Sequence, residues 1–335
     1  MPMKIALDAM GGDLGPEVTV DGAAAFVKAS NTTVLLVGDP NEIEPFVAQY
    51  NMDRLVVVPA KRVIAMDEHP VSAVRQKTDS SLVVGARLVR EGEADALVSA
   101  GNTGATMAAA LLYMGRIPGI ERPAIACPVP VQRGEAILLD VGANVDCRPQ
   151  HLVQFAGMGR AYMQEVRGIA NPTIGLLNIG QEVSKGNELT IKVHKLLERS
   201  SWNFIGNVEG REVFSGVANV LVCDGFVGNV VLKVAEGLGM MLFDTMKEEL
   251  AVSKLEQLGA RLAKPALYRV RRKLDYTEYG GAPLLGVDGV AIICHGSSDS
   301  IAVRNALSVA EDAVRAGLRD SIANTAVRLG GESSD

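Results

Sequence analysis

The sequence lacks the short motifs that mark several classes of enzyme. No G-x-x-x-x-G-K-[ST] loop occurs, and no G-x-G-x-x-G turn follows an expected strand, so neither a P-loop nor a dinucleotide fingerprint is predicted. The motifs H-E-x-x-H and G-x-S-x-G are absent as well, which removes support for metal-dependent hydrolysis and for a serine nucleophile elbow. We expect no bound metal and no cofactor.

Cysteines and long apolar runs are also scarce. The four cysteines, at positions 127, 147, 223 and 294, form no C-x-x-C pair, and the N-terminus lacks the pattern of a secretion signal, which is typical of a protein of the reducing cytoplasm. No continuous apolar run approaches the roughly 20 residues of a membrane span, so we expect membrane contact to be peripheral. The net charge of −6 argues against nucleic acid as a partner.

What the sequence does contain is a regular alternation of short apolar runs and longer helical patterns. The apolar runs do not alternate with polar residues, which is typical of strands buried on both faces of a parallel sheet. The fold class is therefore α/β, with helices covering a central, largely parallel sheet. Helices are predicted over residues 16–29, 41–50, 70–91, 103–114, 149–166, 186–200 and 228–250.

Glycine and short polar residues follow many of the expected strands. Helix N-termini carry unpaired N–H donors and partial positive charge, and glycine lets the backbone approach an anion closely, so these turns are candidate phosphate sites. The alternative is that the glycines serve close packing of helix on sheet. The candidate binding residues are Gly11, Gly12, Asn102, Thr103, Asn178, Asn187, Asp224, Gly225, Gly228 and Asn229.

Two of these turns resemble each other. Residues 94–104 (ADALVSAGNTG) align without gaps on residues 218–228 (ANVLVCDGFVG). In parallel sheets ligands bind at the carboxyl ends of the strands, so one interpretation is that two equivalent helix N-termini line one cleft. The other is that any two strand-to-helix turns look alike.

Two lysines and one histidine are candidates for the chemistry. Lys185 lies in a turn between Ser184 and Gly186, and Lys233 falls one helical turn beyond Asn229 on the same face, so both can bind an anion, although a solvated lysine is the default. His295 follows an apolar strand and is either a helix-start residue or a proton carrier. The remaining histidines are interpreted as cap or surface residues: His69, His151 and His194.

Residues 238–279 interrupt the alternation with a basic, amphipathic pattern. Leucines keep helical spacing on both sides of Pro265, which predicts a two-armed helical hairpin. It can pack on the body or on a second subunit, or its charge can meet an acidic protein or an anionic membrane. Residues 331–335 are expected to form a flexible tail. The candidate docking residues of the hairpin are Arg261, Lys264, Arg269, Arg271, Arg272 and Lys273.

Five stretches together resemble the bacterial PlsX family of phosphate acyltransferases. They are KIALDAMGGDLGPE, SAGNTGA, LLNIGQEVSKGNEL, CDGFVGNVVLKVAEG and GGAPLLGVDGVAIICHGSS, in the family's order, and the resemblance covers about residues 3–330. It implies one three-layer α/β/α catalytic domain over residues 1–330, similar to phosphotransacetylases and to isocitrate and isopropylmalate dehydrogenases. It also implies a homodimer without bound nicotinamide.

The resemblance implies a reaction between inorganic phosphate and acyl–acyl carrier protein that yields free carrier and an acyl phosphate. A membrane glycerol-3-phosphate acyltransferase would use that product in phospholipid synthesis, so the protein is expected at the inner face of the cell membrane. On chemical grounds Lys185, Asn187, Asn229 and Lys233 would bind phosphate. Asn102 and Thr103 would assist at the carbonyl, and His295 or Asp224 would handle the proton.

Three other functions remain open on the sequence. A phosphotransacetylase-like enzyme would move short acyl groups between coenzyme A and phosphate. A regulator would bind acyl ligands at the membrane without turnover. A dehydrogenase is the least favoured, because the dinucleotide fingerprint is absent.

Overall fold

The computed structural model describes residues 2–274 and 280–332, and an 11-stranded sheet forms its centre, in the order β3-β2-β1-β4-β11-β10-β5-β6-β9-β7-β8. The first strand shows why these runs become strands: Ile5 and Leu7 enter one core and Ala6 the other, so both faces are buried. The strands are β1 (Lys4–Asp8), β2 (Thr33–Gly38), β3 (Leu55–Pro59), β4 (Ala96–Ser99), β5 (Ala124–Val129), β6 (Ala136–Leu139), β7 (Ile174–Asn178), β8 (Phe204–Glu209), β9 (Val220–Val222), β10 (Ala282–Leu285) and β11 (Val290–Ile293).

Helices cover both faces of the sheet, which confirms the three-layer α/β/α class. One layer holds α1 (Gly15–Ala29), α2 (Pro40–Val47), α6 (Pro149–Glu165), α7 (Glu188–Arg199), α10 (Ser300–Arg315) and α11 (Leu318–Glu332). The other holds α3 (Pro70–Gln76), α4 (Ser81–Arg90), α5 (Thr103–Ala109), the π-helix η1 (Ala110–Met114) and the base of α8 (Gly225–Glu249). A short 3-10 helix, η2 (Gly210–Glu212), follows β8.

The helix predicted over residues 70–91 is two helices. α3 ends at Gln76, and α4 starts afresh because the Ser80 side chain accepts a hydrogen bond from the backbone of Val83 as an N-cap. At the other end of the chain α11 continues to Glu332, through two residues expected in the tail, while residues 333–335 lie outside the described part.

The sheet consists of two parallel blocks that run in opposite directions. β3, β2, β1, β4 and β11 are parallel to one another, as are β6, β9, β7 and β8. Between the blocks, β10 is antiparallel to both β11 and β5, and β5 is antiparallel to β6. The prediction of a mostly parallel sheet is confirmed within each block, but the reversal between the blocks was not expected.

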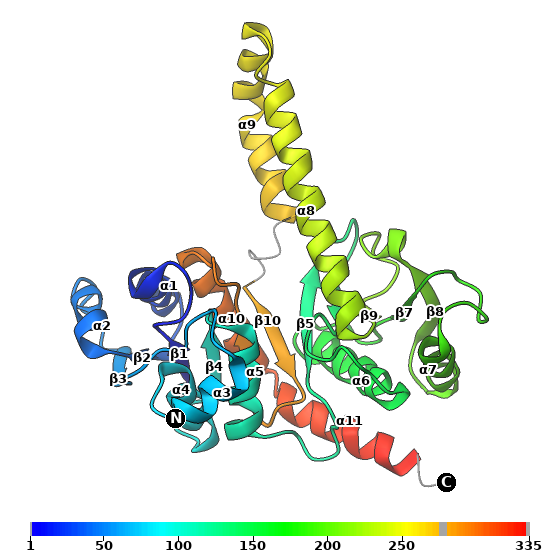
Figure 1. Ribbon diagram of the computed structural model, residues 1–335, viewed down its shortest axis with the longest axis horizontal. Coiled ribbons are helices and arrows are strands. Elements are labelled where there is room, and N and C mark those ends of the chain that lie inside the picture. The colour runs from blue at the N-terminus through cyan, green and yellow to red at the C-terminus, as the bar shows by residue number, and fades with distance from the viewer. Residues whose placement is uncertain (1, 275–279, 333–335) are drawn as a thin grey trace.

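A hairpin of two long helices, α8 and α9 (Lys254–Leu274), projects from the body (Figure 1). Its first arm starts at Gly225 rather than at residue 238, because α8 runs without interruption from the sheet to the tip. Residues 275–279, the predicted end of the hairpin, lie outside the described part, as do the side chains of Arg271, Arg272 and Lys273.

Of the helices in the described ranges, α8 alone is long and apolar enough to span a membrane by length and composition; its most apolar 18-residue window has a mean hydropathy of 1.5 and is 6% buried. α8 contains no continuous apolar run of this length, so it does not contradict the expectation drawn from such runs. Counting uninterrupted apolar residues missed α8 because Lys233 and Glu236 interrupt the run, and these two side chains form an ion pair with each other.

Candidate active site

The loop after β6 is built around a buried carboxylate, that of Asp140. One oxygen accepts hydrogen bonds from the backbone of Ile125 (3.0 Å) and Ala143 (3.1 Å), and the other accepts from the backbone and side-chain nitrogens of Asn144 (2.6 and 2.9 Å). Burial raises the pKa of Asp140, whereas these four donors oppose the rise. Asp140 and Asn144 therefore shape the surface on which α8 begins.

The two glycines at the start of α8 serve close packing. A Cβ on Gly228 would lie 1.9 Å from the carbonyl oxygen of Asp140, and one on Gly225 would lie 2.8 Å from the backbone of Asn144. The Gly225 amide donates to the Asn144 carbonyl at 2.7 Å, so this donor is engaged within the protein. The packing interpretation thus holds for both positions, and the Gly225–Gly228 turn offers an anion fewer free donors than the sequence suggested.

Three predicted site residues lie along the first turns of α8. The carboxylate of Asp224 accepts the Val227 amide at 2.9 Å and is the N-cap of the helix. Asn229 is exposed and lies beside Gly142. Lys233 is 56% exposed and pairs with Glu236 at 2.9 Å, so an incoming anion competes with a carboxylate for its ammonium group.

The loop between β7 and α7 groups three further predicted residues. The side chain of Asn178 donates to the carbonyl of Lys185 (3.2 Å), and Asn187 caps α7 by accepting the Thr190 amide (2.9 Å). Lys185 itself is exposed. Leu176 of β7 pairs with Val222 of β9, so Asn178 and Asp224 lie at the same level of neighbouring strands. This loop and the start of α8 therefore share one edge of the sheet.

A second group of predicted residues follows β1, β4 and β11. Both ends of the Asn102 amide are engaged: its oxygen accepts the Ala105 amide (3.0 Å), and its nitrogen donates to the carbonyls of Met66 (2.9 Å) and Glu68 (3.2 Å). Thr103 is exposed. The Asn102 side chain is thus engaged in holding the segment before α3, which leaves the oxyanion role proposed for it without a free donor in this conformation.

Of the other members of the second group, Gly11 packs against buried Asp8. A Cβ on Gly11 would lie 2.7 Å from the Asp8 carboxylate, and one on Gly12 would lie 3.2 Å from the Gly296 carbonyl. Ser99 donates to Asp8 at 2.8 Å, and burial raises the pKa of this carboxyl group. His295 is exposed, and its Nδ1 lies 2.7 Å from the hydroxyl oxygen of Ser297.

The two groups lie in different blocks of the sheet. Gly11, Gly12, Asn102, Thr103 and His295 follow strands of the β3-to-β11 block, whereas the residues from Asn178 to Lys233 follow strands of the block that runs the other way. β10 and β5 lie between them. The two turns that resemble each other in sequence therefore start helices in separate blocks and are not neighbours on one edge.

Cysteine chemistry is disfavoured by burial. Desolvation raises the pKa of Cys127, Cys147 and Cys294 to about 12, and that of Cys223 also lies well above its ordinary value. A thiolate nucleophile is therefore not a feature of this surface. Separately, within the described residues, no three His, Cys, Asp or Glu side chains gather in a way that could hold a metal ion.

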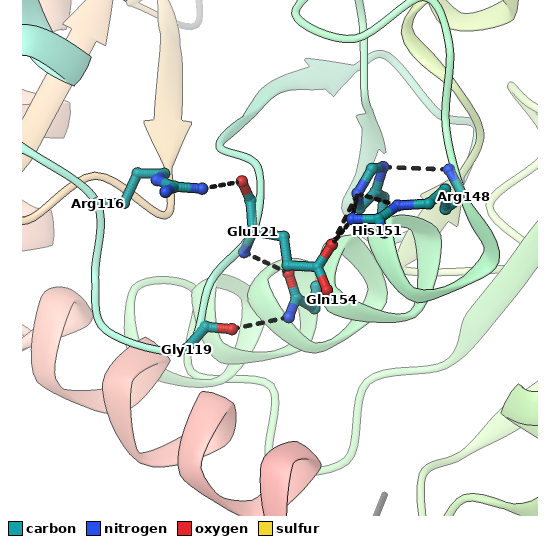
Figure 2. Close-up of polar contacts among 6 residues, drawn as sticks. All are labelled: Arg116, Gly119, Glu121, Arg148, His151 and Gln154. Atoms are coloured by element: carbon teal, nitrogen blue, oxygen red, sulfur yellow. Dashed lines mark hydrogen bonds and ion pairs between the residues drawn. The ribbon is translucent and has the colours of Figure 1, made fainter.

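His151 was interpreted as a cap or surface residue, and the structure confirms that it is a cap. What the sequence did not indicate is its burial, with 2% of its surface exposed. Its Nδ1 accepts the Arg148 amide (3.1 Å), and its Nε2 lies 3.0 Å from the Glu121 carboxylate, which also pairs with the Arg148 guanidinium (Figure 2). Burial lowers the pKa of His151, which favours the neutral ring.

This cap predicts a pH-dependent stability. The unfolded chain has a histidine near the ordinary pKa of 6.5, and the folded value is lower, so between the two values the unfolded state binds more protons. The contribution of His151 is complete above pH 6.5 and is lost as the pH falls through the folded pKa.

The measurement is urea unfolding at pH 8 and pH 5. His151→Asn retains an acceptor for the Arg148 amide but does not titrate, so wild type should lose more stability than this variant on acidification. Equal losses in the two proteins would show that the neutral ring makes no difference.

Comparison with known proteins supplies the family. The model of the family described as "Fatty acid synthesis protein" matches residues 3–320. A phosphate acyltransferase from Heliobacterium modesticaldum is 55% identical over 316 residues, covering 93% of this chain and 94% of its own. One from Desulfitobacterium hafniense (strain Y51) is 53% identical over 322 residues, covering 96% of each chain.

The solved structures extend this to the fold. The EutD phosphotransacetylase from Staphylococcus aureus superposes with a TM-score of 0.61 at 18% identity, over 94% of each chain; a likeness at this identity shows the fold alone. Together with the relatives above, this superposition agrees with the fold predicted from the sequence motifs. The chain belongs to the phosphate acyltransferase family, the PlsX family, and is an acyltransferase.

Proposed function

We propose that the protein transfers the acyl group of acyl–acyl carrier protein to inorganic phosphate, the first step of phosphatidic acid synthesis. The observation that carries this assignment is the shared edge at β7 and β9, where exposed Lys185 and Asn187 adjoin the start of α8 with exposed Asn229. Exposed amide and ammonium donors on two neighbouring loops suit a small dianion. Family membership supplies the reaction type.

In the proposed reaction, a phosphate oxygen attacks the thioester carbonyl carbon and forms a tetrahedral oxyanion. The C–S bond then breaks, the acyl phosphate is released, and the carrier thiolate takes up a proton. Lys185 and Lys233 would hold the phosphate in line and offset its charge. Lys233 must exchange its partner Glu236 for phosphate.

The proton step is assigned to Asp224 or His295. Asp224 lies at the phosphate edge but uses one carboxylate oxygen as the cap of α8. Thr103 and His295 lie in the other block, so they take part only where the substrate extends across β10 and β5.

The decisive experiment incubates the purified protein with palmitoyl carrier protein, with and without phosphate. Free carrier thiol and an acyl phosphate that hydroxylamine can trap should appear together, and only with phosphate. Acetyl coenzyme A as donor tests the phosphotransacetylase-like alternative, and a protein that turns over neither donor fits the regulator. Thiol release that does not require phosphate would contradict the proposal.

The exposed hairpin is proposed to provide the partner surfaces. Its side chains leave a groove of about 590 Å³ between α8 and α9 near the tip, with Lys247, Arg261 and Lys264 among apolar neighbours. Large apolar side chains are exposed along both arms, with exposed fractions of 63% for Val234 and 77% for Leu262. An apolar surface of this extent calls for a cover.

We assign the apolar face of the hairpin to a second copy of the chain, which makes the protein a homodimer. Its basic residues, Arg269 included, would then meet the acidic carrier protein or an anionic membrane at the cytoplasmic face. We interpret the apolar face of α8 as a packing surface and not as a membrane span, because the first turns of the helix pack on Asp140 at the sheet.

Reversing two hairpin charges should weaken the encounter with the carrier. In Arg261→Glu/Lys264→Glu we expect the KM for acyl carrier protein to rise several-fold at low salt, with kcat and folding retained, because rim charges mainly affect association. The measurement is kinetics at increasing ionic strength, which should reduce the difference from wild type.

The matched control is Lys61→Glu/Arg87→Glu, which makes the same change in net charge at exposed positions of the other block. If this control raises the KM equally, the effect belongs to overall charge and not to the hairpin.

A further inference from the structure

A buried polar pair lies against the loop that carries Lys185. His194 on α7 and Asn207 on β8 are 5% and 7% exposed, and the His194 Nδ1 lies 3.0 Å from the Asn207 Oδ1. The interpretation of His194 as a cap or surface residue is therefore wrong. Nothing in the reaction described above uses either residue directly, so their burial needs another explanation.

The hydrogen bonds of the pair run in one direction. An amide oxygen only accepts, so His194 must donate from Nδ1. The other end of the Asn207 amide donates to the carbonyl of Glu182 at 3.0 Å. The same carbonyl accepts the backbone amide of Lys185 at 3.0 Å. A chain of hydrogen bonds thus extends from the helix through the strand to the turn that bears the lysine.

An irregularity in β8 brings Asn207 to this place. Ile174 of β7 pairs with Phe204, but Leu176 pairs with Asn207, so β8 has one residue more than β7 over this span. Gly206, within the extra length, has a φ of +96°, which favours glycine. Bulges of this kind redirect a side chain and are frequent next to active sites.

The ring of His194 is fixed from a second side. It packs edge-on against Phe204, with ring centroids 5.1 Å apart and planes at 76°. The donor at Nδ1 therefore has little freedom to turn away from Asn207.

The conformation of the loop depends on hydrogen bonds and not on core packing. Every residue from Gln181 to Lys185 is exposed, so core packing does not position the loop, and its anchors are polar. Asn178 holds the carbonyl of Lys185 from one side (3.2 Å), and Asn207 holds the carbonyl of Glu182 from the other (3.0 Å).

We propose that His194 and Asn207 are positioning residues, which hold the 179–187 loop in the conformation that presents Lys185 to the phosphate. The inference rests on the proposed function for the identity of the anion, but the anchoring itself is a property of the chain. Neither residue touches the substrate. Their loss should therefore impair phosphate use more than use of the acyl carrier.

A pair of substitutions at His194 separates the hydrogen bond from the bulk of the ring. His194→Asn places an amide nitrogen near the position of Nδ1 and can still donate to Asn207, whereas His194→Gln reaches toward the position of Nε2. We expect His194→Gln to lower kcat/KM for phosphate about tenfold, with the KM for acyl carrier protein unchanged. His194→Asn should stay within about threefold of wild type.

A second variant tests the next link without removing packing. Asn207→Asp can still accept from His194 but presents an oxygen to the Glu182 carbonyl, so the donor is lost. We expect the same selective loss for phosphate, and faster hydrogen exchange of backbone amides over residues 182–186 in both Asn207→Asp and His194→Gln. Urea unfolding of each variant shows whether it is folded under assay conditions.

The outcomes separate the proposed function from the anchoring of the loop. Wild-type protein that forms no acyl phosphate defeats the proposed function, while the exchange measurement still tests the anchoring. If wild type is active and the variants show unchanged phosphate kinetics with unchanged exchange of the loop, the positioning role is overturned. Equal losses in His194→Asn and His194→Gln, or losses shared by both substrates, would also overturn it.

Discussion

Lys185→Ala is expected to lower phosphate-dependent turnover at least tenfold, which corresponds to about 1.4 kcal/mol of transition-state stabilisation. The ammonium group is exposed, and the backbone beneath it is held at two points, by Asn178 and by the Glu182 carbonyl. Removing it leaves the phosphate with less compensation for its charge as the thioester is attacked.

The measurement is initial rate at limiting and at saturating phosphate. Lys195→Ala is the matched control, because Lys195 is an exposed lysine on α7, the helix that follows the loop, and should leave both rates unchanged. A Lys185→Ala enzyme with wild-type kinetics at limiting phosphate would remove this residue from the site.

Gly228→Ala is expected to have the largest effect on stability, a loss of about 3 kcal/mol in the free energy of unfolding. The added methyl group would lie 1.9 Å from the Asp140 carbonyl oxygen and 3.0 Å from the Cys223 sulfur. Backbone cannot yield as a flexible side chain can, so the first turns of α8 must lift from the loop that Asp140 organises. Asn229 would move with them, and activity should fall as well.

Gly237→Ala provides the comparison within the same helix. Nothing lies within 4 Å of a Cβ at this position, so the substitution should stabilise the helix by up to about 1 kcal/mol through its better helix propensity. Urea unfolding of both variants measures the contrast. If Gly228→Ala proves as stable as wild type, the glycine is not required for close packing.

Local features of the fold could be predicted well from the sequence. The helices over residues 16–29 and 149–166 lie within one residue of α1 and α6, because their apolar spacing and their starts are encoded within a few residues. β5 and β10 depart from the alternation of apolar runs and helical patterns. Each contains proline, at Pro128 and Pro283, and each runs against its neighbours, so neither follows the strand–helix alternation.

The candidate site could be predicted only in part. Its lysines and asparagines were found because they follow apolar strands, and the structure places those after β7 and β9 on one edge. One interpretation placed the two similar turns in one cleft, whereas the sheet puts them in blocks of opposite direction, because three successive pairings between β11 and β6 are antiparallel. The roles of His194 and Asn207 were missed because a polar residue within a helix or strand gives no signal of what it contacts.

By itself, the sequence determined the class of fold, the family, the residues that end strands and start helices, and the basic hairpin, since all of these depend on residues close together in the chain. Tertiary structure alone decided which turns share an edge, why Gly225 and Gly228 must be glycine, and which buried groups hold the Lys185 loop. These depend on contacts between distant segments, such as Gly228 with Asp140 and Asn207 with Glu182. The physical reason is that hydrogen bonding and close packing act through space, while spacing along the chain encodes only periodicity and local conformation.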